Sequence, residues 1–299
     1  MQILNNLPPY NFGGIENQDY KNAKIVILPV PYDSATSYKS GARNGPNAII
    51  SASRNLEFYS EELNVNIQKE VGIYTTEELT PNLNSLEENI KDISKEVAII
   101  LDDNKVPLII GGDHSIALGS IMAIASKYKD FSILHFDAHA DRRDKFMGSK
   151  YSHASIITRA NELCSNIYSV GVRSIEENSA KKYKNDILFI NNIHRIRIRK
   201  IADIILKKLK YKKIYLTFDF DVFDISEMPS TGTPEPDGMH FYEVKEILKI
   251  ILQKKELIGA DFVELSPIPG LIAPDYLAAK LIYLTIGYAF SNKHKNKKE

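Results

Sequence analysis

The chain has 299 residues, of which 43% are hydrophobic, and its 38 Lys and Arg balance its 38 Asp and Glu. This composition excludes a disordered or fibrous protein, and the balance of charge disfavours nucleic acid and anionic membranes as partners, because both require clustered cations. The single cysteine, Cys164, cannot form an intrachain disulfide, which predicts a cytoplasmic location. No apolar run approaches the roughly 20 residues of a membrane span, and residues 1–6 lack the pattern of a secretion signal.

Short β-branched runs alternate with amphipathic stretches along the chain, a pattern typical of βα units whose strands are buried on both faces. It predicts an α/β fold with a mostly parallel sheet. The predicted strands cover Lys24–Val30, Val71–Tyr74, Val106–Ile110, Phe131–Phe136, Asn166–Val170, Ile187–Ile190, Lys213–Phe218 and Leu257–Val263. Weaker helical patterns cover Pro46–Phe58, Ile116–Tyr128, Ile198–Leu209, Tyr242–Leu252 and Pro274–Tyr288.

The strongest helix signal follows Ser85, where Ser85 and Glu88 have the spacing of a capping box. Ile90, Ile93 and Val97 then fall on one helical face. No repeat and no linker rich in Gly, Ser or Pro divides the chain, so residues 1–299 are predicted to form one domain. The lysine-rich end, residues 292–299, is predicted to be a flexible basic tail.

Acidic and histidine residues gather where three predicted strands end. The strand ending at Phe136 continues into Asp137-Ala138-His139-Ala140-Asp141, and the strand ending at Phe218 continues into Asp219-Phe220-Asp221. The strand ending at Ile110 continues into Gly111-Gly112-Asp113-His114-Ser115. In extended chain, side chains at every second residue would share one side. Because the carboxyl ends of parallel strands meet at one edge of a sheet, these groups are expected to converge on one crevice.

Carboxylates gathered without a counter-charge share protons or recruit a cation. Four aspartates and two neutral histidines carry four negative charges, which two divalent ions would balance. The set is rich in oxygen, has some nitrogen and lacks sulfur, which favours Mn²⁺, although Zn²⁺, Fe²⁺ and Co²⁺ also accept imidazole. A pair of such ions typically lowers the pKa of a bound water and holds the resulting hydroxide, so hydrolysis is the expected chemistry.

Some neighbouring groups have simpler interpretations. His135 lies inside its predicted strand and is expected to be a hydrogen-bonded core residue. Asp113 is expected to cap the helix that follows it, and Asp224 to fix a turn. Gly111-Gly112 lacks the G-x-G-x-x-G spacing, which argues against a dinucleotide site.

With these motifs in this order, the chain resembles the ureohydrolases, the family of arginases and agmatinases. Gly111–Ser115, Asp137–Asp141 and Thr217–Asp221 match the three metal segments of that family. Residues 31–38 and 41–46 resemble the agmatinase entrance loop and first helix, and Asp261–Pro267 resembles the family's substrate-carboxylate segment. The resemblance covers nearly the whole chain. It implies a three-layer α-β-α fold with a sheet of roughly eight strands.

The resemblance also implies roles for individual residues. Asp141 would orient the attacking hydroxide, His153 would carry a proton to the leaving amine, and Glu264 would bind the guanidinium group. Glu176 falls near a family position that faces the substrate's amine. The first Mn²⁺ would be held by His114, Asp137, Asp141 and Asp219, and the second by Asp137, His139, Asp219 and Asp221.

Agmatine, which would be cleaved to putrescine and urea, is the expected substrate. It carries two positive charges and no carboxylate, and the segment after Asp141 lacks the loop with which arginases grip an amino acid. Aminopropylagmatine, guanidinobutyrate, arginine and formiminoglutamate remain alternatives. Arg142, Arg143 or Lys145 pointing inward would favour guanidinobutyrate or formiminoglutamate.

Two further classes of protein are weighed against this activity. A catalytically silent assembly subunit would lack one or more of the expected ligands, and a deacetylase-like metal hydrolase would have fewer aspartates. All of the expected ligands, His153 and Glu264 are present. The resemblance also implies a homo-oligomer, a trimer or a hexamer.

Overall fold

The computed structural model describes residues 7–34, 36–82 and 85–291. The predicted tail, residues 292–299, lies outside the described residues. At the centre is an eight-stranded sheet with the order β4-β1-β5-β10-β9-β6-β7-β8, in which every neighbouring pair is parallel. Its strands are β1 (Ile25–Val30), β4 (Ile73–Thr75), β5 (Val106–Gly111), β6 (Phe131–Phe136), β7 (Ile167–Val172), β8 (Ile187–Phe189), β9 (Lys213–Asp219) and β10 (Glu256–Val263).

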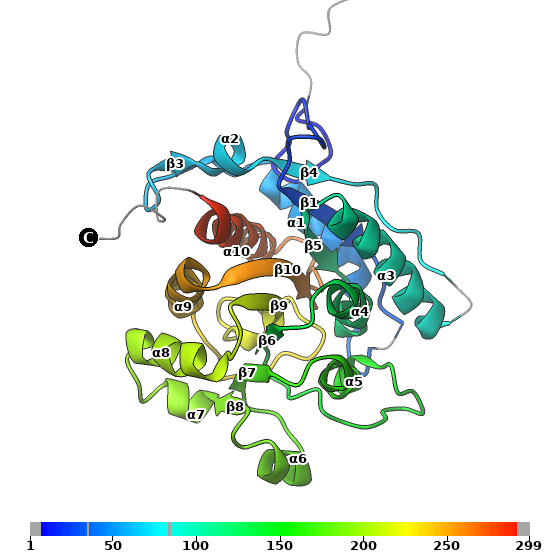
Figure 1. Ribbon diagram of the computed structural model, residues 1–299, viewed down its shortest axis with the longest axis vertical. Helices are drawn as coiled ribbons and strands as arrows, with labels where there is room; N and C mark the ends of the chain where they lie inside the picture. Colours follow the sequence, from blue (N-terminus) through cyan, green and yellow to red (C-terminus); the bar gives the residue numbers. More distant parts are fainter. Residues whose placement is uncertain (1–6, 35, 83–84, 292–299) are drawn as a thin grey trace, which may run out of the picture.

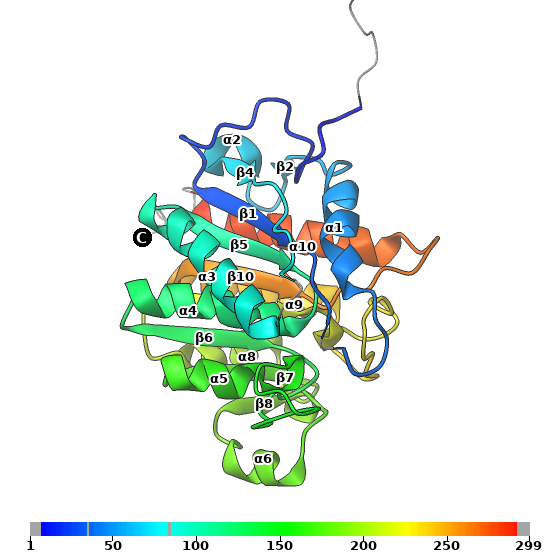
Figure 2. The same cartoon turned by 90° about the vertical axis from the view of Figure 1, so that its right-hand side faces the viewer.

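Helices cover both faces of this sheet (Figure 1). One face packs against α1 (Gly45–Ser53), α8 (Ile198–Lys208), α9 (Phe241–Lys254) and α10 (Ala273–Phe290). The other packs against α3 (Leu86–Asp102), α4 (Ala117–Lys127) and α5 (Ile156–Leu163), which lie in front of the sheet in Figure 2. The fold is therefore the three-layer α-β-α arrangement expected from the sequence.

The strands are mostly apolar because the sheet has a helical layer on both sides. In β1, Ile25 and Ile27 join one core cluster, whereas Val26 and Leu28 join the other. This alternation follows from the two-residue period of a strand. It confirms the prediction of a parallel sheet buried on both faces, and all eight predicted strands are present.

The short elements were the ones that the sequence did not predict. They are α2 (Ile67–Val71), α6 (Glu177–Lys182), α7 (Ile190–Ile193), the helix α5, and a hairpin of β2 (Tyr59–Ser60) with β3 (Val65–Asn66). Two boundaries also differ. Val71 ends α2 rather than starting a strand, because Gly72 (φ +71°) turns the chain into β4. The helix predicted over residues 46–58 ends at Ser53, where tight turn bonds from Asn55 N to Ala52 O (3.1 Å) and from Leu56 N to Ser53 O (3.0 Å) take over.

In the described part of the chain, no helix combines the length and apolarity that crossing a bilayer requires.

Candidate metal centre

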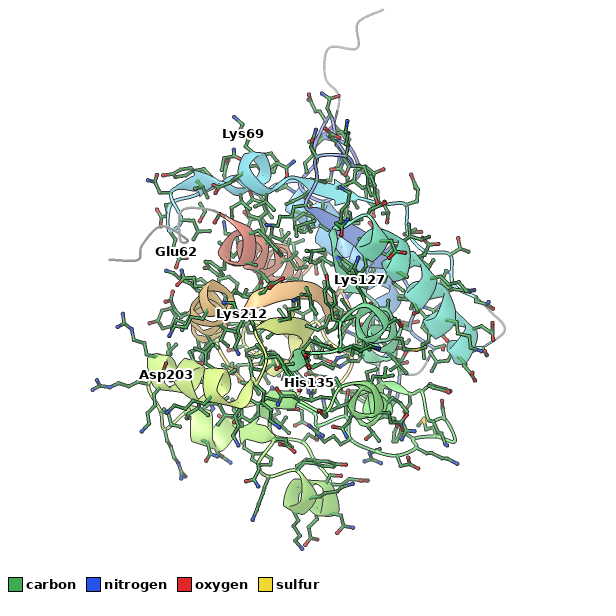
Figure 3. All side chains as sticks on the ribbon, viewed as in Figure 1. Glu62, Lys69, Lys127, His135, Asp203 and Lys212 are labelled. Carbon is green, nitrogen blue, oxygen red and sulfur yellow. The ribbon has the colours of Figure 1, made fainter. Side chains whose placement is uncertain are left out.

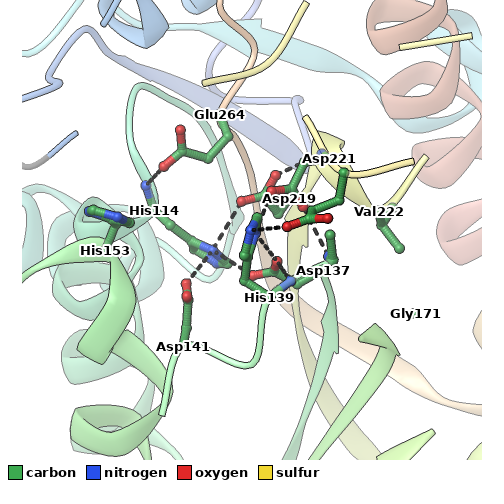
Figure 4. A network of polar contacts seen from close by, with 12 residues as sticks. His114, Asp137, His139, Asp141, His153, Gly171, Asp219, Asp221, Val222 and Glu264 are labelled. Carbon is green, nitrogen blue, oxygen red and sulfur yellow. Dashed lines mark hydrogen bonds and ion pairs between the residues drawn. The ribbon is translucent and has the colours of Figure 1, made fainter. Parts of the chain in front are cut away.

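The predicted ligands lie together at the carboxyl ends of the central strands. β5, β10, β9 and β6 are neighbours in the sheet, and each is followed by polar residues of the site. His114 follows β5, Asp137 follows β6, Asp219 ends β9, and Glu264 follows β10. Figure 4 shows their side chains meeting in one cluster. The sheet order thus brings together residues that are up to 150 positions apart in the sequence.

His114 faces three carboxylates. Its Nδ1 atom lies 3.2 Å from Asp137 Oδ2, 3.3 Å from Asp141 Oδ2 and 3.4 Å from Asp219 Oδ2 (Figure 4). This nitrogen is fully buried and makes no hydrogen bond. A buried nitrogen surrounded by oxygens without bonding to any of them is arranged to share a ligand with those oxygens.

His139 forms the second half of the cluster. Its Nδ1 lies 2.8 Å from Asp221 Oδ2 and 3.6 Å from Asp137 Oδ1. Asp137 therefore contacts both histidines, through its two different oxygens. Such an arrangement suits a carboxylate that bridges two ions.

Local turns aim these side chains. Asp219 Oδ1 accepts a hydrogen bond from Asp221 N (2.7 Å), and Asp137 Oδ1 accepts one from His139 N (2.5 Å). The expectation of fully extended chain here is corrected, because Phe220–Val222 forms a short 3₁₀ turn directly after β9. Asp141 and Glu264 have positive φ angles of 48° and 69°, which are uncommon for residues other than glycine and concentrate at functional sites.

The protonation behaviour of the carboxylates indicates a shortage of positive charge. Burial, with the charges of Asp221 and Asp137, raises the pKa of Asp219 well above its usual range. Burial and the charge of Asp137 also raise the pKa of Asp221. For Asp137 itself, burial raises the pKa, but the three histidines around it, His114, His135 and His139, outweigh burial and lower it. The cluster as a whole carries more negative charge than its own histidines neutralise.

The histidines respond in the opposite direction. Burial lowers the pKa of His114, but the three surrounding carboxylates outweigh burial and raise it well above its usual value. Likewise, burial is outweighed at His139, where Asp221 and Asp137 raise the pKa to about 12. Divalent cations would supply the charge that the cluster lacks, and aspartate oxygens with imidazole nitrogens are ligands that such cations accept. The residues present therefore fit a pair of divalent ions.

Glu264 and His153 flank this cluster. Glu264 Oε1 accepts a hydrogen bond from His114 N at 2.7 Å, which fixes the carboxylate beside the metal residues (Figure 4). Burial and the charge of Asp113 raise its pKa well above the usual range. His153 Nε2 lies 3.3 Å from Ser37 Oγ, and its ring meets Phe146 edge-on with centroids 5.6 Å apart. Both residues line one open cavity of about 270 Å³, together with Asp141, Asp219 and Asp221.

The outer wall of the cavity contains the residues whose roles the sequence left open. Glu176 and Arg143 both line it, and Arg143 Nη1 lies 3.3 Å from Glu176 Oε1. Arg142 also lines it. Its guanidinium stacks on the Tyr183 ring at 4.3 Å, and its Nε and Nη2 are buried without a hydrogen-bond partner among the described residues. Lys145 is exposed and is absent from the described lining. Arg143 is thus paired with a carboxylate, whereas Arg142 is held by ring stacking and has two nitrogens without a hydrogen bond in the described part of the chain.

Several supporting residues were not found from the sequence. Thr217 Oγ1 lies 2.8 Å from His114 Nε2 and donates a hydrogen bond to Asp261 Oδ1 (2.7 Å). The other oxygen of Asp261, Oδ2, accepts a hydrogen bond from the Tyr215 hydroxyl (2.7 Å). Glu235 Oε1 lies 3.7 Å from His139 Nε2. Thr217 stands two residues before Asp219 on the same strand, so the two-residue period could have identified it.

The residues given simpler interpretations behave as expected. His135, in the interior of the molecule in Figure 3, contacts Asp137 Oδ2 at 2.8 Å and Ser169 Oγ at 3.0 Å. Asp113 Oδ1 caps the turn at Ser115 N (3.0 Å). Asp224 accepts bonds from Ser226 N (3.0 Å) and Gly238 N (3.1 Å), which fix the following loop.

Comparison with known proteins finds one matching family and several similar sequences and structures. A model of the arginase family matches residues 23–287. The N(1)-aminopropylagmatine ureohydrolase of Thermus thermophilus is 38% identical over 92% of this chain and 93% of its own, and the agmatinase of Pyrococcus horikoshii is 33% identical over 90% and 93%. The crystal structure of agmatine ureohydrolase from Thermoplasma volcanium superposes with a TM-score of 0.85 at 28% identity, covering 94% of both chains.

Proposed function

The chain belongs to the arginase family, and from that premise we propose that it hydrolyses agmatine to putrescine and urea. It is a hydrolase of guanidino compounds, as its relatives are by name. The observation that carries the proposal is the position of Glu264. This buried carboxylate accepts a bond from His114 N and lines the same cavity as four candidate ligands, His139, Asp141, Asp219 and Asp221. A planar cation bound to it would therefore present its carbon to the metal pair.

The metal pair would be held by the six residues of the cluster. When bound, two divalent ions supply a water of lowered pKa next to the guanidino group. We assign His114 and Asp141 to one ion, His139 and Asp221 to the other, and Asp137 and Asp219 to both. Mn²⁺ is the ion that we propose, since the donor set is mostly carboxylate oxygen.

The chain's own groups then bind and orient the substrate. Glu264 holds the guanidinium through its carboxylate, and the bond from His114 N keeps that carboxylate in place. Because the pKa of Glu264 is raised in the free protein, binding of a cation would also favour the charged form of this carboxylate. Asp141, which faces the same space as His114 Nδ1, is placed to accept a hydrogen bond from the attacking water.

Hydrolysis requires a proton on the departing nitrogen. Water adds its oxygen to the guanidinium carbon, the bond from that carbon to the alkyl-bearing nitrogen breaks, and this nitrogen leaves as an amine after taking up a proton. We assign that transfer to His153 Nε2, which faces Ser37 at the cavity wall. The other product is urea.

The outer part of the cavity supports a cationic tail rather than an anionic one. Glu176 is a carboxylate on this wall, and its partner Arg143 is held by an exposed ion pair of the kind worth about 0.2–1 kcal/mol. An ammonium group could displace so weak a partner. A carboxylate tail would instead need an accessible guanidinium, whereas Arg143 is paired with Glu176 and Arg142 is buried against the Tyr183 ring.

N(1)-Aminopropylagmatine is the second candidate substrate. Proteins named as its ureohydrolases are up to 38% identical to this chain, compared with 33% for the agmatinase of Pyrococcus horikoshii. The cavity is open to solvent, so an aminopropyl extension could project beyond Glu176. The two substrates differ only in that extension, and the same metal cluster would act on both.

A substrate panel tests the proposal. The metal-loaded protein would be given agmatine, aminopropylagmatine, guanidinobutyrate and arginine separately, and urea would be measured; formiminoglutamate would be followed by release of formamide. We expect the highest kcat/KM for agmatine. A higher value for aminopropylagmatine would replace the first candidate by the second, and absence of product from every compound with metal bound would refute the hydrolase assignment.

We further propose that the protein works in the cytoplasm as a homo-oligomer that feeds polyamine synthesis. Its one cysteine, Cys164, is a free and buried thiol, which suits a reducing compartment. Putrescine, the expected product, is a diamine. The presence of all six ligand residues, His153 and Glu264 in one site argues against a catalytically silent subunit.

A further inference from the structure

Arg173 lies directly after β7, outside the candidate metal ligands, and touches both of the main ligand segments. Its backbone N donates to Ala138 O at 2.8 Å, and Ser174 N donates to the same oxygen at 2.9 Å. Ala138 is the residue between Asp137 and His139. The main chain at Arg173 therefore fixes the turn that presents these two side chains.

The side chain of Arg173 fixes the other segment. Nη2 donates to Asp221 O (2.7 Å) and Phe223 O (3.2 Å), and Nη1 donates to Val222 O (3.3 Å) and to Gly171 O (3.2 Å). These carbonyls belong to the 3₁₀ turn that carries Asp221 and to its flanks. A turn of this kind is too short to satisfy all of its own carbonyls, and Arg173 supplies donors to them; Val222 O also accepts a bond from Met239 N (3.0 Å).

The same guanidinium reaches a third segment. Nη2 also donates to Glu235 O (2.8 Å), and Nε donates to Pro236 O (2.9 Å). Glu235 is the residue whose carboxylate lies 3.7 Å from His139 Nε2. One side chain thus bonds to six backbone carbonyls, and every one of them belongs to the site or borders it.

The packing around Gly171 shows how closely these segments approach. A Cβ atom at Gly171, which has φ +97°, would lie 2.5 Å from Val222 Cγ2 and 3.3 Å from Asp137 O. The backbone at the end of β7 therefore packs closely against both the segment that carries Asp137 and the segment that carries Asp221. Gly171 and Val222 both border the cluster in Figure 4.

We propose that Arg173 is a positioning residue that sets the distance between His139 and Asp221, and so builds the second of the two metal positions. This inference rests on the proposed function only in taking those residues as ligands. The selectivity follows from the contacts. Arg173 is bonded to Asp221 itself, to the neighbours of Asp221 and to Ala138, which precedes His139, whereas none of its described bonds goes to His114 or Asp141, which complete the first position.

Lysine cannot make the same set of hydrogen bonds as Arg173. A guanidinium carries five N–H donors in a rigid plane and can serve carbonyls from several directions, whereas an ammonium group has three donors on a flexible stem. Arg173→Lys keeps the charge but removes most of the contacts. Residues that orient metal ligands typically change metal affinity 10- to 100-fold when substituted.

Metal titration of the chelator-treated protein tests the proposal without reference to activity. In a His114→Asn background, which leaves the second position, we expect Arg173→Lys to weaken Mn²⁺ binding about 10- to 100-fold by calorimetry. In a His139→Asn background, which leaves the first position, the same substitution should change the affinity less than about twofold. Arg199→Lys, at an exposed arginine of α8, is the matched control and should change neither affinity.

Equal loss at both positions would refute the inference and assign Arg173 a general structural role. Unchanged affinity at both would also refute it. If Arg173→Lys does not fold, Arg173→Ala with millimolar guanidinium chloride answers the same question: restored binding at the second position supports the proposal, and failure to restore it contradicts the proposal. A protein that binds two ions but cleaves no guanidino substrate would refute the proposed function and leave this inference standing.

Discussion

Asp219→Asn separates a metal ligand from a structural ion-pair partner, because the two roles have opposite effects on stability. Asparagine keeps the oxygen that accepts the hydrogen bond from Asp221 N, so the turn survives. It removes a carboxyl group whose pKa is raised by burial and by the charges of Asp221 and Asp137. A buried acid with a raised pKa costs stability at neutral pH, so the substitution should raise the melting temperature of the metal-free protein.

In the presence of metal, Asp219→Asn should instead reduce stability relative to wild type, because the substitution removes a proposed ligand. At a free Mn²⁺ concentration 100 times the Kd, each bound ion adds about 2.7 kcal/mol, so two ions add about 5 kcal/mol. Unfolding entropy near 2.1 cal/mol/K per residue gives about 0.6 kcal/mol/K for 299 residues. The wild-type melting temperature should therefore rise by about 8 °C with Mn²⁺. Because Asp219 is assigned to both ions, Asp219→Asn should lose at least half of that rise.

Thermal unfolding with chelator and with Mn²⁺ measures both effects on the same samples. Asp203→Asn, at an exposed position on α8 (Figure 3), is the matched control and should leave both temperatures within about 1 °C. A lower melting temperature for metal-free Asp219→Asn, with the full Mn²⁺ effect retained, would identify Asp219 as a structural partner and refute the reasoning.

Three further results are expected. Glu264→Gln should keep two metal ions but lower kcat/KM about 10- to 150-fold, the effect expected from losing one charge-assisted hydrogen bond. Loss of metal in this variant would contradict the assignment of Glu264 to substrate binding. His153→Asn should lower kcat about 10²- to 10⁴-fold with little change in KM, whereas a rate near wild type would exclude proton transfer by His153. In the metal-free protein, the pKa of His139 is raised from 6.5 to about 12. Above pH 6.5, His139 therefore stays protonated in the folded state but loses its proton in the unfolded state. The free energy of unfolding should then fall by up to about 1.4 kcal/mol per unit as pH rises from 6.5, and a flat urea-unfolding profile between pH 6.5 and 8 would contradict this.

The main features of the fold could be predicted because they depend on long, regular patterns. The runs at Val106–Gly111, Phe131–Phe136 and Lys213–Asp219 are mostly apolar and buried on both faces, and each leads into acids or histidine. Parallel pairing then brings the groups together. Short elements such as α2 and the β2–β3 hairpin have too few residues for a period to be recognised.

The supporting groups of the site could not be predicted in the same way. Arg173 acts on backbone carbonyls, which every residue has, so no side-chain pattern indicates its partners. Asp261 is linked to His114 by hydrogen bonds through Thr217, and that link depends on the pairing of β10 with β9. The pairing of Arg143 with Glu176 depends on two loops whose shapes follow from the packing of the whole fold.

A crystal structure of the Mn²⁺-loaded protein, with anomalous scattering recorded from manganese, tests the central claim most directly. We expect two anomalous peaks about 3.5–4 Å apart, one beside His114 and Asp141 and the other beside His139 and Asp221, with Asp137 and Asp219 contacting both. A single peak, or peaks away from these side chains, would contradict the binuclear centre and the hydrolysis that depends on it.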